Sequence, residues 1–367
     1  MSIQVLLGVS ITVVLILLAV GIHYEAWSFS SNGLTSIRSA MVCALLLVGL
    51  SVAQPVEGSQ LTFSAWLEAF AVEARQRGIS QSTLDASLAD VERIPAVIEL
   101  DRRQPKEPGD FCGYLDARLT EARIARGRSL LQEHRALLRR VSSEYGVPAR
   151  FVVALWGLET NFGDYQGEYR VIDALATLAH DERRGALFRK QLLAALRIVE
   201  EGHQNPANLK GSWAGAMGQV QLMPTTFLDY AVDYDGDGRR NIWSSLPDAF
   251  ASAASYLKRS GWHSGQTWGR EVQLPASLRG NRKALAERRS ISDWLGAGVV
   301  RIDGGALPRA DMRGKIVMPA AKSTDAFLVY SNFEAILRWN QSIFFGISVG
   351  TFADEFSHTA SLRACRS

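Results

Sequence analysis

A glutamate lies inside an apolar helical segment of this 367-residue chain. Glu159 follows Val152, Leu155 and Trp156 by seven, four and three residues, which places it on the apolar face of a helix. A buried carboxylate is costly unless a cation pairs with it or it stays protonated. The residues alone leave both explanations open, a structural ion pair with a nearby arginine or lysine, or a proton held for chemistry.

Flanking residues indicate where this helix begins and ends. Pro148 suits the first turn of a helix, and Asn161 and Gly163 are stop signals. Glu159 is therefore expected near the helix C-terminus, next to a polar loop at residues 164–169. The negative end of the helix dipole would raise the pKa of a carboxyl group there.

Helical periodicity dominates the rest of the chain and predicts a mainly α protein. Helices are expected over residues 61–89, 114–145, 172–180, 187–202, 247–260 and 330–352. Glycines, prolines and short β-like runs predict a small strand-containing insertion at residues 268–325. The predicted regions are an N-terminal α region at 61–140, a core at 141–267, this insertion, and a C-terminal helix at 326–358 that completes the core.

Residues 1–53 carry two apolar segments that indicate export. Residues 5–22 are uncharged and just long enough to span a bilayer. Residues 41–53 follow Arg38 and end in small residues, as a secretory signal does. Either the first segment is a membrane anchor or translation begins later, and both explanations place the folded part in the periplasm or cell envelope.

Composition and cysteine usage add two expectations. The chain is 47% hydrophobic with a net charge of +3, and its basic clusters lack regularly interleaved aromatics, so we expect a globular protein that binds no nucleic acid. Cys43 lies in the signal-like segment. Cys112 and Cys365 either pair in an oxidising compartment or remain thiols.

Residues 211–226, GSWAGAMGQVQLMPTT, form a second informative segment. Its small residues let a backbone approach a ligand or another segment closely. Ser212, Gln219 and Gln221 offer neutral donors and acceptors suited to sugar hydroxyl and amide groups, and Trp213 could stack on a pyranose ring. A tightly packed turn with satisfied polar groups is the alternative interpretation.

Residues 233–244, DYDGDGRRNIWS, resemble an EF-hand loop. Asp233, Asp235 and Asp237 alternate before a glycine, the backbone carbonyl of Arg239 would follow, and hard oxygen ligands favour calcium. Ser244 stands where the bidentate glutamate is usual, and the next acid is Asp248. An Asp/Gly-rich surface turn is the alternative.

Four motifs in order resemble the lytic transglycosylase B family. They are residues 156–163 (WGLETNFG), residues 212–224 (SWAGAMGQVQLMP), the aspartate-rich loop, and residues 330–340 (YSNFEAILRWN). The resemblance covers roughly residues 61–356 and implies a lysozyme-like helical core, an additional α domain and a small β domain.

The resemblance also implies an activity and a set of site residues. The family cleaves the MurNAc–GlcNAc bond of peptidoglycan without water and leaves a 1,6-anhydro end on MurNAc, using one glutamate that falls on Glu159. Peptidoglycan glycan strands are the implied substrate, a monomer is expected, and cell-wall synthases or hydrolases are further partners. No organic cofactor is implied, and calcium would be structural, with the loop 233–248 holding it through Asp233, Asp235, Asp237, Arg239 and Asp248. The implied sugar-contacting residues are Ser212, Met217, Gln221, Tyr256 and Asn340.

This sequence departs from the family pattern at two places. Asp248 comes one residue later than expected, and Gln219 and Val220 stand where a tyrosine or glutamine and a small residue are expected. Two other functions stay open. One is a water-using muramidase with Asp164 or Glu168 as second carboxylate. The other is a non-catalytic, calcium-dependent peptidoglycan-binding scaffold, in which Glu159 would pair with a base such as Arg170.

Overall fold

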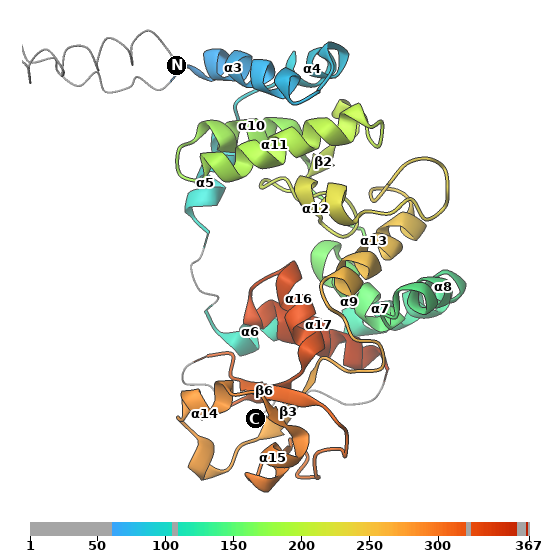
Figure 1. Cartoon of the computed structure of the whole chain (residues 1–367), viewed down its shortest axis with the longest axis vertical. Helices are drawn as coiled ribbons and strands as arrows, with labels where there is room; N and C mark the ends of the chain where they lie inside the picture. Colours follow the sequence, from blue (N-terminus) through green and yellow to red (C-terminus); the bar gives the residue numbers. More distant parts are fainter. Residues whose placement is uncertain (1–60, 105–108, 321–323, 358–364, 366–367) are drawn as a thin grey trace, which may run out of the picture. The chain divides into compact units, whose positions relative to one another are not determined.

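The computed structural model describes residues 61–104, 109–320, 324–357 and 365 (Figure 1). Contacts divide the chain after Gln60 into two units, and the second, Leu61–Ser367, contains all described residues. The apolar and signal-like segments expected in residues 1–53 lie outside them. Among the described helices, none is both long enough and apolar enough to cross a membrane.

The described residues are mainly helical, which confirms the predicted fold class. The helices are α3 (Phe63–Gln76), α4 (Gln81–Leu88), α5 (Pro95–Arg102), α6 (Phe111–Asp116), α7 (Glu121–Glu133), α8 (Arg135–Tyr145), α9 (Ala149–Thr160), α10 (Val171–His180), α11 (Gly185–Glu200), α12 (Pro224–Tyr230), α13 (Leu246–Arg259), α14 (Arg282–Ala286), α15 (Ile291–Gly296), α16 (Ser331–Trp339) and α17 (Ile343–Phe356). Two 3₁₀ turns, Pro206–Asn208 and Ala276–Leu278, lie between them.

Capping residues divide two segments that the periodicity predicted as single helices. The expected helix at 114–145 is instead parts of α6, α7 and α8, and Thr120 caps α7 by accepting the backbone N–H of Arg123. The expected helix at 330–352 breaks at Asn340, and Ser342 caps α17 by accepting the N–H of Phe345. A side-chain oxygen at a helix start satisfies an otherwise unpaired backbone donor, so a new helix begins there although the apolar spacing continues.

The predicted N-terminal α region does not pack as one unit. Helices α3 and α5 contact α10, and α4 contacts α11. Helices α7 and α8 contact α9 instead, and α6 packs on α17. The residues between α5 and α6 therefore connect two different packing neighbourhoods, and the boundary near residue 140 corresponds to no change in packing.

Helix α9 lies at the centre of the second neighbourhood, because α7, α8, α13 and α17 all contact it. Its residues Phe151–Gly157 are all buried. A helix that is apolar on nearly every side is stable only when neighbours cover it all round. The sequence of α9 therefore requires a place inside a helical bundle, and its last turn keeps some exposed surface at Leu158 and Glu159.

The predicted strand-containing insertion is an antiparallel sheet with the strand order β4-β6-β7-β3-β5. Its strands are β3 (Gly269–Gln273), β4 (Arg289–Ser290), β5 (Val300–Arg301), β6 (Arg313–Val317) and β7 (Ala326–Val329). Strand β7 pairs with both β3 and β6 and is fully buried, so the insertion extends to Val329 rather than ending at residue 325. The sheet has its own apolar core, which contains Trp294 and Tyr330.

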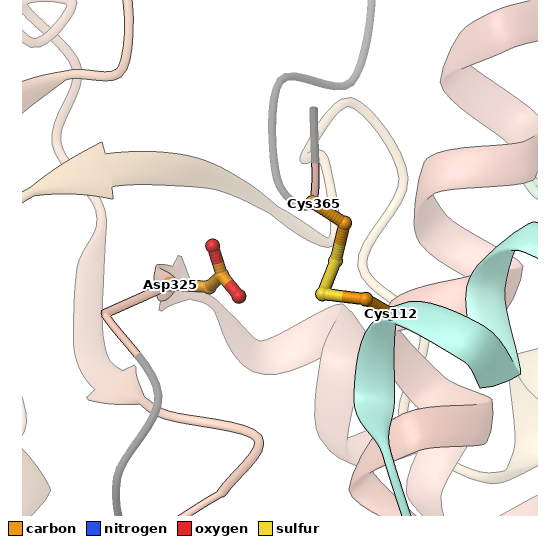
Figure 2. A group of neighbouring side chains, drawn as sticks. All are labelled: Cys112, Asp325 and Cys365. Carbon is orange, nitrogen blue, oxygen red and sulfur yellow. A yellow bond between two sulfur atoms is a disulfide. The ribbon is translucent and has the colours of Figure 1, made fainter. Parts of the chain in front are cut away.

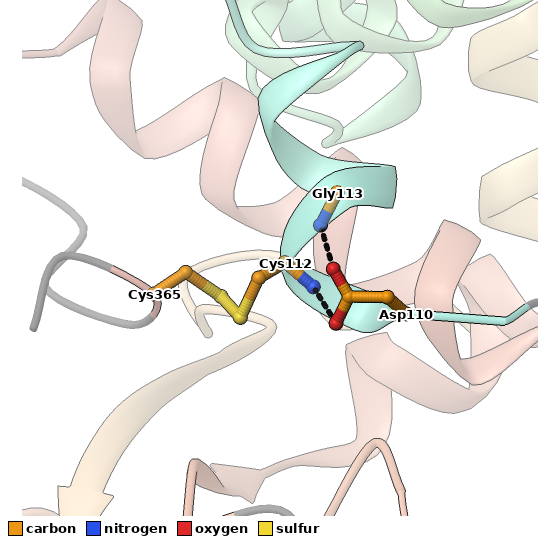
Figure 3. The surroundings of a disulfide bond; sticks show 4 residues. All are labelled: Asp110, Cys112, Gly113 and Cys365. Carbon is orange, nitrogen blue, oxygen red and sulfur yellow. Dashed lines mark hydrogen bonds between the residues drawn. A yellow bond between two sulfur atoms is a disulfide. The ribbon is translucent and has the colours of Figure 1, made fainter.

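A disulfide joins Cys112 on α6 to Cys365, which settles the pairing that the sequence left open (Figure 2). The two Cα atoms are 5.2 Å apart across a sequence separation of 253 residues. Figure 3 shows that Asp110 caps the same helix, accepting the backbone N–H of Gly113 at 2.6 Å and that of Cys112 at 3.3 Å. The bond thus attaches the C-terminal end of the chain to the first turn of α6.

Candidate active site

Glu159 occupies the last turn of α9, one residue before the helix ends. Asn161 follows in the left-handed conformation with φ 53°, as its predicted role as a stop signal requires. The Glu159 carboxyl group accepts one hydrogen bond, from the indole Nε1 of Trp339 to Oε1 at 2.8 Å. No ion pair to Glu159 occurs within the described part of the chain, so its one hydrogen-bonding partner there is neutral.

Burial raises the pKa of Glu159 to about 7, and the hydrogen bond from Trp339 opposes that rise. The residue keeps some exposed surface at the end of α9, yet protein atoms surround its carboxyl group closely enough for desolvation to dominate its ionisation. Near neutral pH the group therefore exists as both acid and carboxylate. A residue in this state can donate a proton and later take one back.

A cavity of about 310 Å³ opens beside this carboxyl group. Its wall is formed by Arg123, Leu158, Glu159, Thr160, Asn161 and Tyr165. Tyr165 lies in the loop after α9 with 60% of its surface exposed, so its ring is accessible to a ligand in the cavity. A ligand in the cavity would meet an acid, a guanidinium group and an aromatic ring together.

Three aromatic rings lie in series from Glu159. Trp339 makes an edge contact with Tyr256, with ring centroids 4.8 Å apart, and Tyr256 contacts Tyr230 at 4.6 Å. The Tyr256 hydroxyl donates to the backbone oxygen of Arg338 at 2.5 Å, which ties α13 to α16. The predicted sugar-contacting residue Tyr256 is thus connected to the acid through Trp339, which the sequence argument did not single out.

The segment 211–223 is joined to α9 through Gln219. Its amide oxygen accepts the indole N–H of Trp156 at 2.7 Å, and its backbone oxygen accepts the Thr160 hydroxyl at 2.7 Å. Gln219 was discussed above as a position that could alter a sugar subsite. Its contacts give it a structural role next to the acid. Sequence spacing gave no signal for this contact, because the partners are about sixty residues apart.

The predicted sugar-contacting residues of this segment differ in accessibility. Met217 is fully buried in the apolar core and bridges Gly211 and Leu222, so its side chain supports the turn and offers no surface to a ligand. Ser212 accepts the N–H of Ala216, and Gln221 donates to Gln166 and Gly218 while remaining partly exposed. Both polar residues thus hold the turn and retain surface for a ligand.

Asn340 follows the last residue of α16 and is exposed. Its side-chain oxygen accepts the N–H of Ser342 at 3.0 Å. Asn340 is adjacent in sequence to Trp339. The same short segment therefore holds the Asn340 amide group and the indole that donates to Glu159.

Two of the three groups that the alternative functions named, Asp164 and Arg170, have other partners. Asp164 is exposed and bound by both terminal nitrogens of Arg126, and this hydrogen bond holds the pKa of Asp164 below its usual value. Glu168 is exposed. Arg170 pairs with Asp173 at 3.3 Å, so the Glu159–Arg170 pair expected for a scaffold does not form.

The aspartate-rich loop brings three carboxylates together, because oxygen atoms of Asp233, Asp235 and Asp248 lie within 4.8 Å of one another. Asp237 stays outside this group and accepts the N–H of Arg239. Asp248 is fully buried, and burial raises its pKa. Converging carboxylates with hard oxygen donors fit a calcium ion.

Asp248 also organises the backbone of this loop. Its Oδ1 accepts the N–H groups of Tyr234 and Asp235, and its Oδ2 accepts that of Asn241. A carboxylate has about four lone-pair sites, so about one is left for a metal. Asp248 therefore cannot replace the bidentate glutamate of an EF-hand loop while it keeps these three hydrogen bonds.

Comparison with known proteins places this geometry in context. A family model described as a transglycosylase SLT domain matches residues 62–354. Membrane-bound lytic murein transglycosylase B of Escherichia coli K12 is 30% identical over 284 residues, which cover 75% of this chain and 77% of that protein.

Solved structures agree in fold. SltB3 from Pseudomonas aeruginosa, in complex with NAG-anhNAM-pentapeptide, matches with a TM-score of 0.78 at 44% identity, covering 81% of this chain and 80% of that chain. Escherichia coli lytic transglycosylase Slt35, in complex with calcium, matches with a TM-score of 0.69 at 28% identity, covering 80% of this chain and 92% of that one.

Proposed function

The chain belongs to the transglycosylase SLT domain family and is a lytic transglycosylase of peptidoglycan, and on this premise we propose that Glu159 alone serves as its acid and base. The product would be a glycan end carrying 1,6-anhydro-MurNAc. The observation that carries the proposal is a carboxyl group with a neutral donor and a pKa of about 7 at the wall of a cavity.

The reaction needs the two protonation states of one carboxyl group in sequence. Protonated Glu159 donates its proton to the glycosidic oxygen, and the bond from that oxygen to C1 of MurNAc breaks. The Glu159 carboxylate then takes the proton of the C6 hydroxyl as the C6 oxygen bonds to C1. Every atom is accounted for without water, and the acid returns to its starting state.

A second carboxylate is what a hydrolytic muramidase would need as nucleophile or base. Asp164 is the nearest acid in sequence, and its two oxygens are bound by Arg126. A carboxylate neutralised in this way is a poor base and a poor nucleophile. This arrangement supports the water-independent route over hydrolysis by way of Asp164.

Substrate contacts are proposed for the residues around Glu159 that retain exposed surface. Ser212, Gln221, Tyr256 and Asn340 would meet the sugars, and Trp339 and Tyr165 join them. Neutral amide and hydroxyl groups suit sugar hydroxyls, and aromatic rings suit the apolar faces of pyranose rings. Met217 would act only by supporting the turn that carries Ser212 and Gln221.

Calcium is proposed as a structural ion of the loop 233–248. Asp233, Asp235 and Asp248 would hold it, with Asp237 and the backbone oxygen of Arg239 as further candidates that the loop could supply. When bound, the ion would neutralise converging negative charge and stabilise the loop, with no part in bond cleavage. The protein would act in the periplasm or cell envelope, with residues 5–22 as its membrane anchor.

Mass spectrometry of the muropeptides released from purified peptidoglycan by the full chain tests the function. Anhydro-muropeptides from the wild type and none from Glu159→Gln would support it. Glu168→Gln, in the exposed loop after α9, is the matched control and should retain activity. Reducing ends from the wild type would instead establish hydrolysis, and a folded protein that binds peptidoglycan without releasing product would establish the scaffold.

A further inference from the structure

We propose that Gln219 is a positioning residue for Glu159: it fixes the last turn of α9 and thereby the direction in which the carboxyl group points. The inference rests on the proposed function, in which this one group must serve two substrate oxygens in turn. Gln219 acts through Trp156 and Thr160, which lie three residues before the acid and one residue after it. It is thus a determinant of turnover rather than of substrate affinity.

The backbone that follows Glu159 is strained and has to be held in place. Asn161, Phe162 and Gly163 all have positive φ, at 53°, 60° and 87°. For a bulky residue such as phenylalanine, the left-handed conformation costs free energy. Such a conformation persists only where surrounding contacts impose it, so the turn that ends α9 depends on its neighbours.

The Thr160 hydroxyl group makes two of these contacts. It accepts the backbone N–H of Gly163 at 3.0 Å and donates to the backbone oxygen of Gln219 at 2.7 Å. The other acceptor within its reach, the backbone oxygen of Trp156, is farther away at 3.2 Å. A hydroxyl group has a single hydrogen, so its donation to Gln219 leaves a lone pair for Gly163. Gln219 thus holds the left-handed turn from outside the helix.

The side chain of Gln219 reaches the same helix turn by a second route. Its Oε1 accepts the indole N–H of Trp156 at 2.7 Å, and its Nε2 donates to the backbone oxygen of Trp243 at 3.2 Å. Trp156 is 4% exposed, so its N–H has little access to water and relies on this acceptor. A Cβ on Gly163 would lie 2.3 Å from Oε1, so a glycine is needed for the amide group to approach the turn this closely.

Residues 242 and 243 give Gln219 a fixed support. Its backbone N–H donates to the oxygen of Ile242 at 2.9 Å, and Ile242 is fully buried. Gly218 approaches the same oxygen so closely that a Cβ there would lie 2.7 Å from it. The turn is therefore anchored on one side to the core and on the other to the end of α9. Trp339 holds the carboxyl group of the acid, and Gln219 holds the backbone that carries it.

Three roles for Gln219 lead to different kinetic expectations. A residue that binds sugar changes KM, and one that only stabilises the fold changes the melting temperature. A positioning residue lowers kcat and moves the pH profile as well. When the last turn of α9 is loosened, Glu159 loses its hydrogen bond from Trp339. Because this bond lowers the pKa of Glu159, its loss raises that pKa.

Gln219→Met tests the inference in the full chain, because methionine keeps the length of the side chain and removes both of its hydrogen bonds. Kinetics on soluble glycan strands should show kcat lowered about tenfold, KM within about twofold of wild type, and the upper limb of the pH–rate profile at higher pH. Gln219→Glu should recover part of the loss at about pH 5, where a protonated carboxyl group can both accept from Trp156 and donate to Trp243, but not at about pH 8. Gln132→Met, at an exposed glutamine of α7, should behave as wild type.

A titration gives a readout that does not need turnover. Carbon-13 NMR of labelled glutamate measures the pKa of Glu159, whose signal is identified by its absence from Glu159→Gln. We expect a higher pKa in Gln219→Met and in Trp156→Phe, which breaks the same bond from the other side, and their double variant should lower kcat no further than the more impaired single variant. An unchanged pKa, a change confined to KM, or a lower melting temperature with wild-type kcat would overturn the inference. Absence of anhydro products from the wild type would overturn the proposed reaction and leave the titration to decide the role of Gln219.

Discussion

Trp339 donates its indole N–H to Oε1 of Glu159 across 2.8 Å and across 180 residues of sequence. An indole nitrogen can only donate, so Oε1 can only accept from it. The carbonyl oxygen of a protonated carboxyl group is a better acceptor than its hydroxyl oxygen, so this contact favours the proton on Oε2 when Glu159 is protonated. The contact also stabilises the carboxylate that follows proton transfer.

Replacing Trp339 by phenylalanine should raise the pKa of Glu159 above about 7, because the hydrogen bond opposes the effect of burial. The upper limb of the pH–rate profile should move to higher pH, and kcat should fall about tenfold as the carboxyl group loses its fixed orientation. Steady-state kinetics from pH 5 to 9 measures both effects. An unchanged profile would show that the indole does not act on the acid. Tyr165→Phe, which keeps the ring and removes only a hydroxyl, should leave the profile in place.

Glu159→Gln should stabilise the protein at alkaline pH. The pKa of Glu159 is about 7 in the native state, against about 4.3 for an unfolded chain, so between these values the native state holds a proton that the unfolded state has lost. Stability contributed by this residue therefore falls as the pH rises from about 4.5 to 7. The variant removes that loss, a gain of about 3–4 kcal/mol at pH 8 and almost none at pH 4. Thermal melts at both pH values, with Glu168→Gln as control, would contradict this if the gain were independent of pH.

Calcium should raise the melting temperature without changing kcat. Asp233, Asp235 and Asp248 converge within 4.8 Å, and an ion at a hundredfold excess over its Kd would add about 2.7 kcal/mol to the free energy of unfolding. Asp233→Asn should abolish this effect, while Asp229→Asn on α12 should leave it intact. Calorimetry with and without a chelator measures the shift. Loss of activity on chelation, with an unchanged melt, would make the structural assignment wrong.

Reduction of the Cys112–Cys365 disulfide should lower the free energy of unfolding by about 2–4 kcal/mol. The bond closes a loop of 253 residues, which restricts the unfolded chain. Denaturant unfolding with and without a reductant measures the change. The Cys112→Ser, Cys365→Ser double variant should unfold like the reduced wild type and respond to the reductant no further. Equal stability of all three forms would contradict the expectation.

Gly167→Ala should destabilise the protein more than Gly202→Ala. Both glycines have positive φ, 94° and 75°, so both substitutions strain the backbone, but a Cβ on Gly167 would lie 2.1 Å from the backbone of Gly211 while one on Gly202 meets nothing within 4 Å. We expect a cost of about 1 kcal/mol at Gly202 and several times that at Gly167. Circular dichroism melts of both variants give the comparison. Similar losses would show that the Gly167–Gly211 approach is not tight.

The sequence by itself determined the position and character of α9. Apolar residues on nearly every side required burial, Pro148 and Asn161 set the ends, and Glu159 had to stand near the C-terminus among apolar neighbours. These are local effects of spacing, backbone conformation and capping, so they can be inferred without knowing the partners. The aspartate-rich loop was predictable for the same reason, since three of its acids and its glycines lie within a few residues of one another.

Only the tertiary structure decided which groups surround the acid. Trp339 reaches Glu159 from α16, Gln219 reaches Trp156 from the turn before α12, and Arg123 reaches the same cavity from α7. The partner of Arg170, the burial of Met217 and the disulfide likewise depended on segments that are far apart in sequence. Apolar spacing specifies which face of a helix is buried, but not against which helix, because many pairings bury the same area. The choice among them is made by side-chain packing over the whole core, and that choice gives the carboxyl group its neutral donor and its raised pKa.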